Sequence, residues 1–380
     1  MVEVTQRTEP AVRVSTLELF FDLVFVFTIT QLTAVLATDF RPASLGRVVL
    51  MLIIIWWMYD GYAWLTNAVA PTDRTRRTLL LVGMGAFLTL ALSIPSAFTD
   101  NGWVFGLSYF VINAVHSGLF LRAGGASVVQ AMRAGLAPLN LISATLVLVG
   151  GLLPTDPWRY VCWTAAAILM AATPYLFPIG GFSVSPAHFV ERHGLVIIVA
   201  LGESIVAIGA GAAGLDIDLR LLVISVLGLS LAYLLWWVYF EGDDGGAERA
   251  LVAVDPGRRV IVALWAYGYA HVPLLLGIVA FAAGVKKAIG HAFEHLPVGQ
   301  AVALAGGVAV FLAGDVAYRR VLSLGAVRHR VAGAVLALAT IPIGLYAAAA
   351  QMLTLILLLG VMLVVEAGRL TPPPIELRRA

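Results

Sequence analysis

Residues 195–212 read LVIIVALGESIVAIGAGA and contain a single ionisable side chain, Glu203. An α-helix of this length spans about 27 Å, which is close to the roughly 30 Å thickness of the hydrocarbon core of a bilayer. Strands of a membrane barrel would show alternating polarity over about ten residues, whereas this stretch is continuously apolar. It therefore predicts a transmembrane helix.

The same pattern recurs along the rest of the chain. The 380 residues are 61% hydrophobic and only 12% charged, which is more apolar side chain than a soluble domain of this size buries. We predict an all-α, polytopic transmembrane helical bundle. Its helices number about twelve and are placed near 17–37, 45–69, 76–98, 102–122, 135–153, 157–178, 188–212, 218–241, 258–284, 298–318, 329–347 and 350–367.

The distribution of basic residues predicts the orientation. With a cytoplasmic N-terminus, most Arg residues fall on the cytoplasmic side, including Arg7, Arg13, Arg378 and Arg379 of the tails. The positive-inside rule then favours a bacterial inner-membrane protein with both termini in the cytoplasm. The first ten residues lack a basic region followed by a cleavage site, so the first helix is expected to be retained. In the predicted topology, the basic residues on the side of the membrane opposite the cytoplasm are Arg41, Arg47, Arg159, Arg220, Lys286 and Lys287.

Matched features in the same order suggest two similar halves, 1–178 and 188–380. We predict two parallel six-helix repeats, and in transporters with repeats of this kind the binding site lies near the bilayer midplane at the repeat interface. The alignment of residues 23–36 with residues 195–208 places Gln31 opposite Glu203. Further matches pair Trp56-Trp57 with Trp236-Trp237 and Arg76-Arg77 with Arg258-Arg259.

Several classes of function have no support in the sequence. Cys162 is the single cysteine, so an internal disulfide and a Cys-rich metal site are excluded. No Walker lysine, HExxH or GxSxG element is present, and we therefore expect neither an enzyme nor a cofactor. The net charge of +2 calls for no nucleic-acid partner, because the topology explains where the basic residues lie. A homo-oligomer is left open.

Two acidic residues share one face of the first predicted helix. Glu18 and Asp22 are four residues apart, and their charges would repel each other unless a cation, a proton or an arginine lies between them. Arg192, at a similar depth in the helix near 188–212, is the candidate partner. Two interpretations stay open: an ion pair that joins the two helices, or an entry site for a cation or proton.

Glu203 is expected near the bilayer midplane, where an ionisable group is costly and is by default a functional candidate. His271 lies near the middle of another predicted helix, two residues before Pro273, whose missing N–H frees a backbone carbonyl in the preceding turn. A contact between Glu203 and His271 would form a proton relay. The alternative is that each side chain makes an ordinary interhelical hydrogen bond.

Other polar residues are expected in the cytoplasmic half of the membrane. Asp60, Asn113, His116 and Asp315 together suggest a water-accessible vestibule, and the Trp56-Trp57 pair beside Asp60 suits either a membrane-interface belt or a cation–π site. The expected interior is acidic, which favours protons and small cations as guests. It contains Glu18, Asp22, Asp60, Glu191, Glu203 and Asp315, against Arg192 alone.

The sequence also resembles the bacterial low temperature requirement protein A family. The resemblance is carried by residues 17–27 (LELFFDLVFVF), 188–193 (HFVERH, with His188 and Glu191), 201–205 (LGESI), 236–240 (WWVYF) and 271–274 (HVPL). It implies a multi-pass membrane protein and brings no settled biochemical activity. Gly102 and Gly106 form a small-xxx-small face that predicts close packing of their helix against a neighbour.

The leading functional hypothesis is a cation- or proton-coupled transporter with Glu203 as the central site and His271 as its neighbour. Glu18, Asp22 and Arg192 would form an inner gate. A cation or proton channel fits the same acidic interior and is the second hypothesis. A third is a membrane scaffold or lipid-handling protein in which the polar groups serve assembly.

Overall fold

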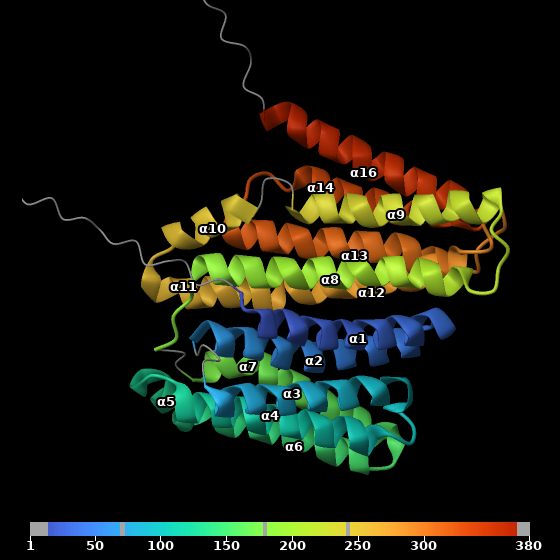
Figure 1. Ribbon diagram of the computed structural model, residues 1–380. Coiled ribbons are helices and arrows are strands. Elements are labelled where there is room, and N and C mark those ends of the chain that lie inside the picture. Colours follow the sequence, from blue (N-terminus) through green and yellow to red (C-terminus); the bar gives the residue numbers. More distant parts are fainter. Residues whose placement is uncertain (1–13, 69–72, 178–180, 241–243, 371–380) are drawn as a thin grey trace, which may run out of the picture. The chain divides into compact units, whose positions relative to one another are not determined.

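The computed structural model describes residues 14–68, 73–177, 181–240 and 244–370, and within these ranges the chain forms helices and no strands (Figure 1). Ten of the described helical segments are long and apolar enough to cross a membrane. The predicted all-α, polytopic helical bundle is confirmed. The expected spans near 157–178 and 329–347 are shorter helices, α7 (Tyr160–Leu176), and α14 (Arg328–Leu338) followed by α15 (Ile341–Gly344). Residues 1–10 and Arg13, Arg378 and Arg379 lie outside the described ranges.

The chain packs into two compact units whose boundaries cut through helices. Unit 1 comprises Met1–Leu32, Gly46–Val199 and Gly242–Tyr269, and unit 2 comprises Thr33–Leu45, Ala200–Glu241 and Ala270–Ala380. These units differ from the two sequence halves, 1–178 and 188–380. The division describes packing and does not test a duplication, so the six-helix repeats stay a prediction.

Unit 1 is built around an aromatic core. The rings of Phe21 and Phe25 on α1 contact Tyr59 on α2, with ring centroids 5.4 and 4.1 Å apart, and Phe21 also packs edge-on against Phe87 of α3. Burying such large rings supplies much of the packing energy of a helix bundle. Helices that contribute to unit 1 are α1 (Thr16–Thr38), α2 (Pro42–Ala68), α3 (Arg74–Ser93), α4 (Gly102–Ala123), α5 (Ala126–Ala131), α6 (Ala137–Leu152), α7, the first part of α8 (Pro186–Ala212), α10 (Asp244–Ala253) and α11 (Pro256–Ala263).

The predicted glycine face of α4 is confirmed. A Cβ atom on Gly106 would lie 2.5 Å from Leu148 Cα on α6, and one on Gly102 would lie 2.9 Å from the carbonyl oxygen of Gly151. Neither position has room for a side chain, because the α4 and α6 backbones approach each other directly. Small residues allow this approach between membrane helices.

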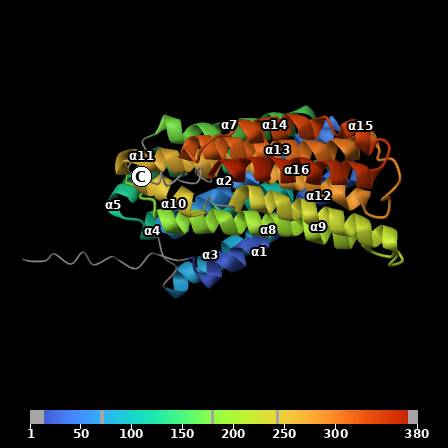
Figure 2. The same cartoon turned by 90° about the horizontal axis from the view of Figure 1, so that it is seen from above.

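Unit 2 has a similar glycine contact between α12 (His271–Ala288) and α13 (Val298–Leu322). A Cβ atom on Gly277 would lie 2.5 Å from Phe311 N and 2.7 Å from Gly307 O, and one on Gly284 would lie 2.8 Å from Leu304 N. Helices α9, α12 and α13 run along a common direction in both views (Figure 1 and Figure 2). The remaining helices of unit 2 are α9 (Leu219–Phe240), α14, α15, α16 (Ala348–Leu370) and the second part of α8.

Replacing Gly277 with valine is expected to lower the free energy of unfolding by about 1–3 kcal/mol, because the added atoms would force α12 and α13 apart. Thermal unfolding in detergent micelles measures this loss. Gly360→Val on α16 is the matched control, since nothing lies within 4 Å of a Cβ atom at that position. Equal losses in the two variants would mean that helix propensity, and not the close contact, sets the effect.

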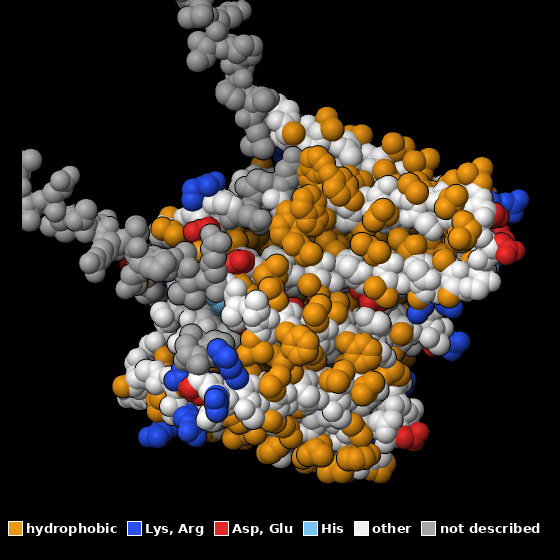
Figure 3. All heavy atoms as spheres, viewed as in Figure 1, with side chains coloured by type: hydrophobic (Ala, Val, Ile, Leu, Met, Phe, Trp, Pro, Cys, Tyr) orange, Lys and Arg blue, Asp and Glu red, His pale blue; other side chains and the backbone are white. Residues whose placement is uncertain are grey.

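The outer surface is suited to lipid. On the face drawn in Figure 3, hydrophobic side chains cover the middle of the helices and charged side chains gather towards their ends. Large apolar side chains such as Leu92, Ile168 and Val364 are more than half exposed. An apolar surface of this extent is typical of a membrane-embedded protein, so the chain is in contact with the lipid bilayer.

Candidate functional site

Two ionisable pairs join α1 to α8 inside unit 1. Arg192 Nη1 donates to Asp22 Oδ2 over 2.8 Å, and His188 Nε2 lies 3.0 Å from Glu18 Oε1. All four side chains are at most 4% exposed. The partners are four residues apart on each helix and keep the same order, so α1 and α8 run in the same direction here. The expected contact of Arg192 with Asp22 is present, whereas Glu18 is paired with His188.

Each carboxylate of these pairs has additional donors. The Tyr59 hydroxyl donates to Asp22 Oδ1, and the Arg192 guanidinium carbon lies 5.5 Å from the centre of the Tyr59 ring. Ser15 donates from both its backbone N–H and its hydroxyl to Glu18 Oε2, each over 2.7 Å. Because the Glu18 N–H lies 3.4 Å from Ser15 Oγ, the two residues form a reciprocal cap at the start of α1.

A third pair is formed by Asp60 on α2 and His193 on α8. His193 Nε2 lies 3.1 Å from Asp60 Oδ1, and Nδ1 lies 2.9 Å from the carbonyl oxygen of Phe189. A carbonyl oxygen and a carboxylate both accept, so both contacts are hydrogen bonds only if the ring carries two protons or if Asp60 itself is protonated. With both hydrogen bonds formed, the pair would contain one proton more than a neutral imidazole and a carboxylate together. His193 is fully buried and Asp60 is 4% exposed.

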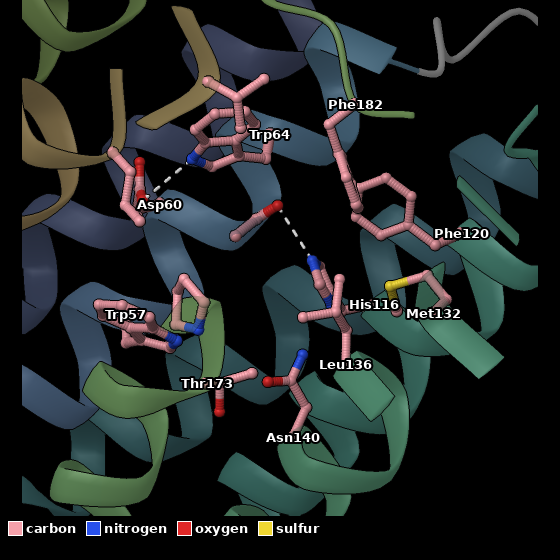
Figure 4. Close-up of a pocket in the computed structure, with 14 residues that line it drawn as sticks. Trp57, Asp60, Trp64, His116, Phe120, Met132, Leu136, Asn140, Thr173 and Phe182 are labelled. Carbon is pink, nitrogen blue, oxygen red and sulfur yellow. Dashed lines mark hydrogen bonds between the residues drawn. The ribbon is translucent and has the colours of Figure 1, made fainter. Parts of the chain in front are cut away.

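A cavity of about 110 Å³ in unit 1 is lined in part by Asp60 (Figure 4). Trp64 Nε1 donates to Asp60 Oδ2 over 3.2 Å, and on another wall His116 Nε2 lies 3.0 Å from the carbonyl oxygen of Gly61. Asp60 and His116 thus line one cavity, whereas Asn113 is buried and is not among its lining residues, so the water-accessible vestibule stays a prediction. The other lining residues are Trp57, Phe120, Met132, Leu136, Asn140, Thr173, Pro174, Phe182, Val260 and Leu264.

The adjacent tryptophans Trp56 and Trp57 have different surroundings. Trp56 is fully buried, and its indole N–H donates to the carbonyl oxygen of Gly268 over 2.7 Å, in the π-helical turn Leu264–Tyr269. A π-turn breaks the regular helical ladder and often marks a functional site. Trp57 lines the cavity beside Asp60. A membrane-interface belt therefore does not describe Trp56, whose indole ring is enclosed by protein.

In unit 2, Glu203 and His271 are both buried, with 3% and 0% exposure. His271 Nε2 lies 3.0 Å from the Tyr239 hydroxyl, a contact that the sequence alone did not suggest. The Ser204 hydroxyl next to Glu203 is buried and has no hydrogen-bond partner within the described part of the chain. The proposed contact between Glu203 and His271 stays a prediction.

The remaining candidates differ in burial. Gln31 is half-buried on α1, and the Glu191 side chain is exposed on α8, so Glu191 does not belong to the acidic interior. Arg330, which the sequence did not single out as an interior residue, is 3% exposed, and its Nη1 donates to Asp315 over 2.5 Å and to the Val238 carbonyl over 2.8 Å. The interior is therefore less acidic than expected, because Arg192 is not its only arginine.

Arg159, expected as an ordinary basic residue on the far side, is 4% exposed and caps helix α6. Its guanidinium donates to five backbone carbonyls over 3.0–3.2 Å, which uses all five of its N–H groups. A helix C-terminus leaves several carbonyls without helical partners, and a buried arginine satisfies them. The acceptors are the carbonyls of Ala97, Thr99, Gly150, Gly151 and Leu153.

Comparison with known proteins agrees with this architecture. Residues 13–367 match the family described as bacterial low temperature requirement A protein (LtrA). An uncharacterized protein of Rhizobium meliloti (strain 1021) is 30% identical over 321 residues, which cover 80% of this chain and 77% of that protein. The family match spans the paired residues of α1, α2 and α8. The chain therefore belongs to the bacterial low temperature requirement A protein family of multi-pass membrane proteins.

Proposed function

We propose that this protein is a cation- or proton-coupled transporter, and not an enzyme, of the bacterial cytoplasmic membrane, with both termini in the cytoplasm. The observation that carries the proposal is the buried Asp60–His193 pair, which joins a carboxyl group to an imidazole ring between two helices that are long and apolar enough to cross a membrane. Ionisable groups at this depth are costly and are usually retained for transport of protons or ions. Glu18–His188 and Asp22–Arg192 extend the array of titratable and charged groups along α1 and α8.

Buried polar atoms of the array that have no hydrogen-bond partner among the described residues support access of water. Arg192 Nε and Nη2 and His188 Nδ1 are buried and have no hydrogen-bond partner among the described residues. Unsatisfied polar groups of this kind are costly in an apolar environment and are commonly satisfied by ordered water. Water beside Arg192 and His188 would link the pairs and give a proton a path along the array.

Glu203 belongs to the proposal as the central acidic site of unit 2. Its carboxyl group is buried within α8, and the neighbouring Ser204 hydroxyl is free to bond water or a cation within the described part of the chain. A carboxylate with an adjacent hydroxyl suits a proton or a small cation as guest. His271 and Tyr239 form a second buried polar contact in the same unit.

Proton flux into reconstituted vesicles tests the proposal. His193→Gln keeps a donor for Asp60 but removes the titratable ring, and Glu203→Gln removes the central acid, so each is expected to reduce cation-driven proton flux by at least about tenfold. A pH-sensitive dye inside the vesicles reports the flux. His291→Gln is the matched control for the histidine variant, because that side chain is 59% exposed.

The outcomes separate the alternatives. Saturable exchange that both variants lose supports a transporter. Single-channel currents that do not respond to an opposing cation gradient would instead support a channel. If both variants fold, as judged by their unfolding temperatures, and retain full flux, the proposal is wrong.

A further inference from the structure

We propose that the cavity beside Asp60 binds a small alkylammonium cation, with Asp60 as its counter-ion and the surrounding rings as its cage. The inference deepens the proposed function by naming the class of substrate, and it rests on that function only for the step of transport. Binding itself depends on the cavity alone. Every residue that lines the cavity belongs to unit 1.

The charge of the lining selects for a cation. Asp60 is the one carboxylate among the lining residues, and that set contains neither lysine nor arginine. Asp60 receives hydrogen bonds from neutral Trp64 on one oxygen and from His193 on the other, and each oxygen retains further acceptor capacity. When the Asp60–His193 pair carries no extra proton, the Asp60 carboxylate would attract a cation and repel an anion.

Aromatic rings form much of the wall. Trp64 and Phe182 contact each other edge to face with centroids 6.3 Å apart, and Phe182 contacts Phe120 in the same way at 5.5 Å. Trp57 lies on the opposite side of the cavity in Figure 4. Rings arranged in this way present their faces and edges to a guest, and aromatic cages recognise alkylated ammonium groups through cation–π attraction.

The size and remaining polar groups suit an organic cation better than a bare metal ion. A cavity needs about 10–15 Å³ by this measure to hold one water molecule, so 110 Å³ accommodates a molecule of several heavy atoms. Metal ions such as Mg²⁺ and Ca²⁺ require about six or more oxygen ligands, whereas the lining offers one carboxylate beside the neutral side chains of Asn140 and Thr173 in a mostly apolar wall. A weakly hydrated alkylammonium group loses little on entering such a site.

His116 provides a second polar contact. Its Nε2 bonds the Gly61 carbonyl, so in the neutral ring Nε2 carries the proton and Nδ1 is an acceptor. Nδ1 is buried and has no partner among the residues that the structure describes. His116 therefore adds a neutral polar ring to the cavity wall that contains Asp60.

The shared carboxylate connects this cavity to the proton array. Asp60 Oδ2 belongs to the wall with Trp64, while Asp60 Oδ1 lies 3.1 Å from His193 Nε2, a contact in which a proton can be shared. A cation in the cavity and a proton on the pair both stabilise the negative charge of one carboxylate. Competition between two ligands for a single site is the simplest form of coupled exchange.

Titration of the purified full chain with choline tests the inference, with tryptophan fluorescence as the readout. The neutral analogue 3,3-dimethylbutan-1-ol has nearly the same shape, so it is expected to bind at least about tenfold more weakly than choline. Asp60→Asn is expected to weaken choline binding at least about tenfold, and Trp57→Leu is expected to weaken it by about threefold to tenfold. Asp100→Asn and Trp158→Leu, at exposed positions, are the matched controls.

Equal binding of choline and its neutral analogue would overturn the inference, and so would full choline affinity in a folded Asp60→Asn variant. If that variant does not fold, Trp57→Leu alone decides the outcome, because Trp57 is only partly buried. Choline binding without proton flux would refute coupled transport and leave the site intact. If proton flux depends on His193 but choline does not bind, the choline site is refuted and the transport proposal stands.

Discussion

Replacing Arg192 with glutamine is expected to destabilise the protein by about 3–5 kcal/mol, because the Asp22 carboxylate would be left buried without its charged partner. Both side chains are 1% exposed, so solvent cannot replace the lost contact at low cost. The Tyr59 hydroxyl remains as a donor to Asp22 and offsets only part of the loss. Thermal or denaturant unfolding in detergent micelles measures the change.

The double variant Asp22→Asn/Arg192→Gln is expected to be more stable than Arg192→Gln alone, because removing both charges removes the unpaired one. The exposed pair of Arg76 and Asp73, 2.8 Å apart, serves as the matched control. Arg76→Gln is expected to change stability by no more than about 1 kcal/mol. A similar small loss in Arg192→Gln would show that the buried pair contributes nothing special to the fold.

Replacing Arg159 with alanine is the second change with a large expected effect, a loss of more than about 3 kcal/mol. Five backbone carbonyls would lose their donor together, and each buried unsatisfied group costs about 1–3 kcal/mol before the structure relaxes. Arg159→Lys is expected to restore little, since an ammonium group has three donors and no planar fork. Unfolding temperatures measured in detergent compare both variants.

Arg220→Ala is the control for Arg159, because Arg220 is an exposed arginine at the start of α9. It is expected to leave the unfolding temperature nearly unchanged. If the Arg159→Lys variant were as stable as the native chain, the result would show that charge alone, and not the shape of the guanidinium, holds the end of α6 in place.

The membrane helices were predictable because a bilayer imposes a simple length and composition on each span. Residues 195–212 illustrate this: the continuous apolar run around Glu203 forms the C-terminal two-thirds of α8 (Pro186–Ala212). The contact between Asp22 and Arg192 was also predictable, since two acids on one helical face at bilayer depth call for a cationic partner. Local pattern and the cost of buried charge were sufficient in both cases.

Other parts of the site depend on how helices are rotated about their axes, which local sequence does not specify. His193 was visible only as a member of the HFVERH motif, and its contact with Asp60 joins residues 133 positions apart. Arg330 lies near the start of the predicted helix at 329–347, and no local pattern indicates that it bonds Asp315 and the Val238 carbonyl. Pairing partners of this kind are set by tertiary packing.

Trp56 and Trp57 show the same limit on a smaller scale. Neighbouring residues of a helix point about 100° apart, so one ring can be enclosed while the next faces a cavity. The sequence alone offered a membrane-interface belt and a cation–π site as alternatives for the pair. In the structure, Trp56 bonds the Gly268 carbonyl and Trp57 lines the cavity.

The hydrogen bond from His193 to the Phe189 carbonyl determines which hydrogen bond the side-chain amide of an Asp60→Asn variant can form. With Nδ1–H committed to that carbonyl, the neutral ring turns a lone pair on Nε2 towards α2. The side-chain NH₂ introduced by Asp60→Asn can donate to this lone pair, so the contact survives with no mobile hydrogen in it. The Asp60→Asn variant would therefore resemble the proton-bound stage of the proposed transport cycle. It could not proceed from that stage, because the amide has no proton to release.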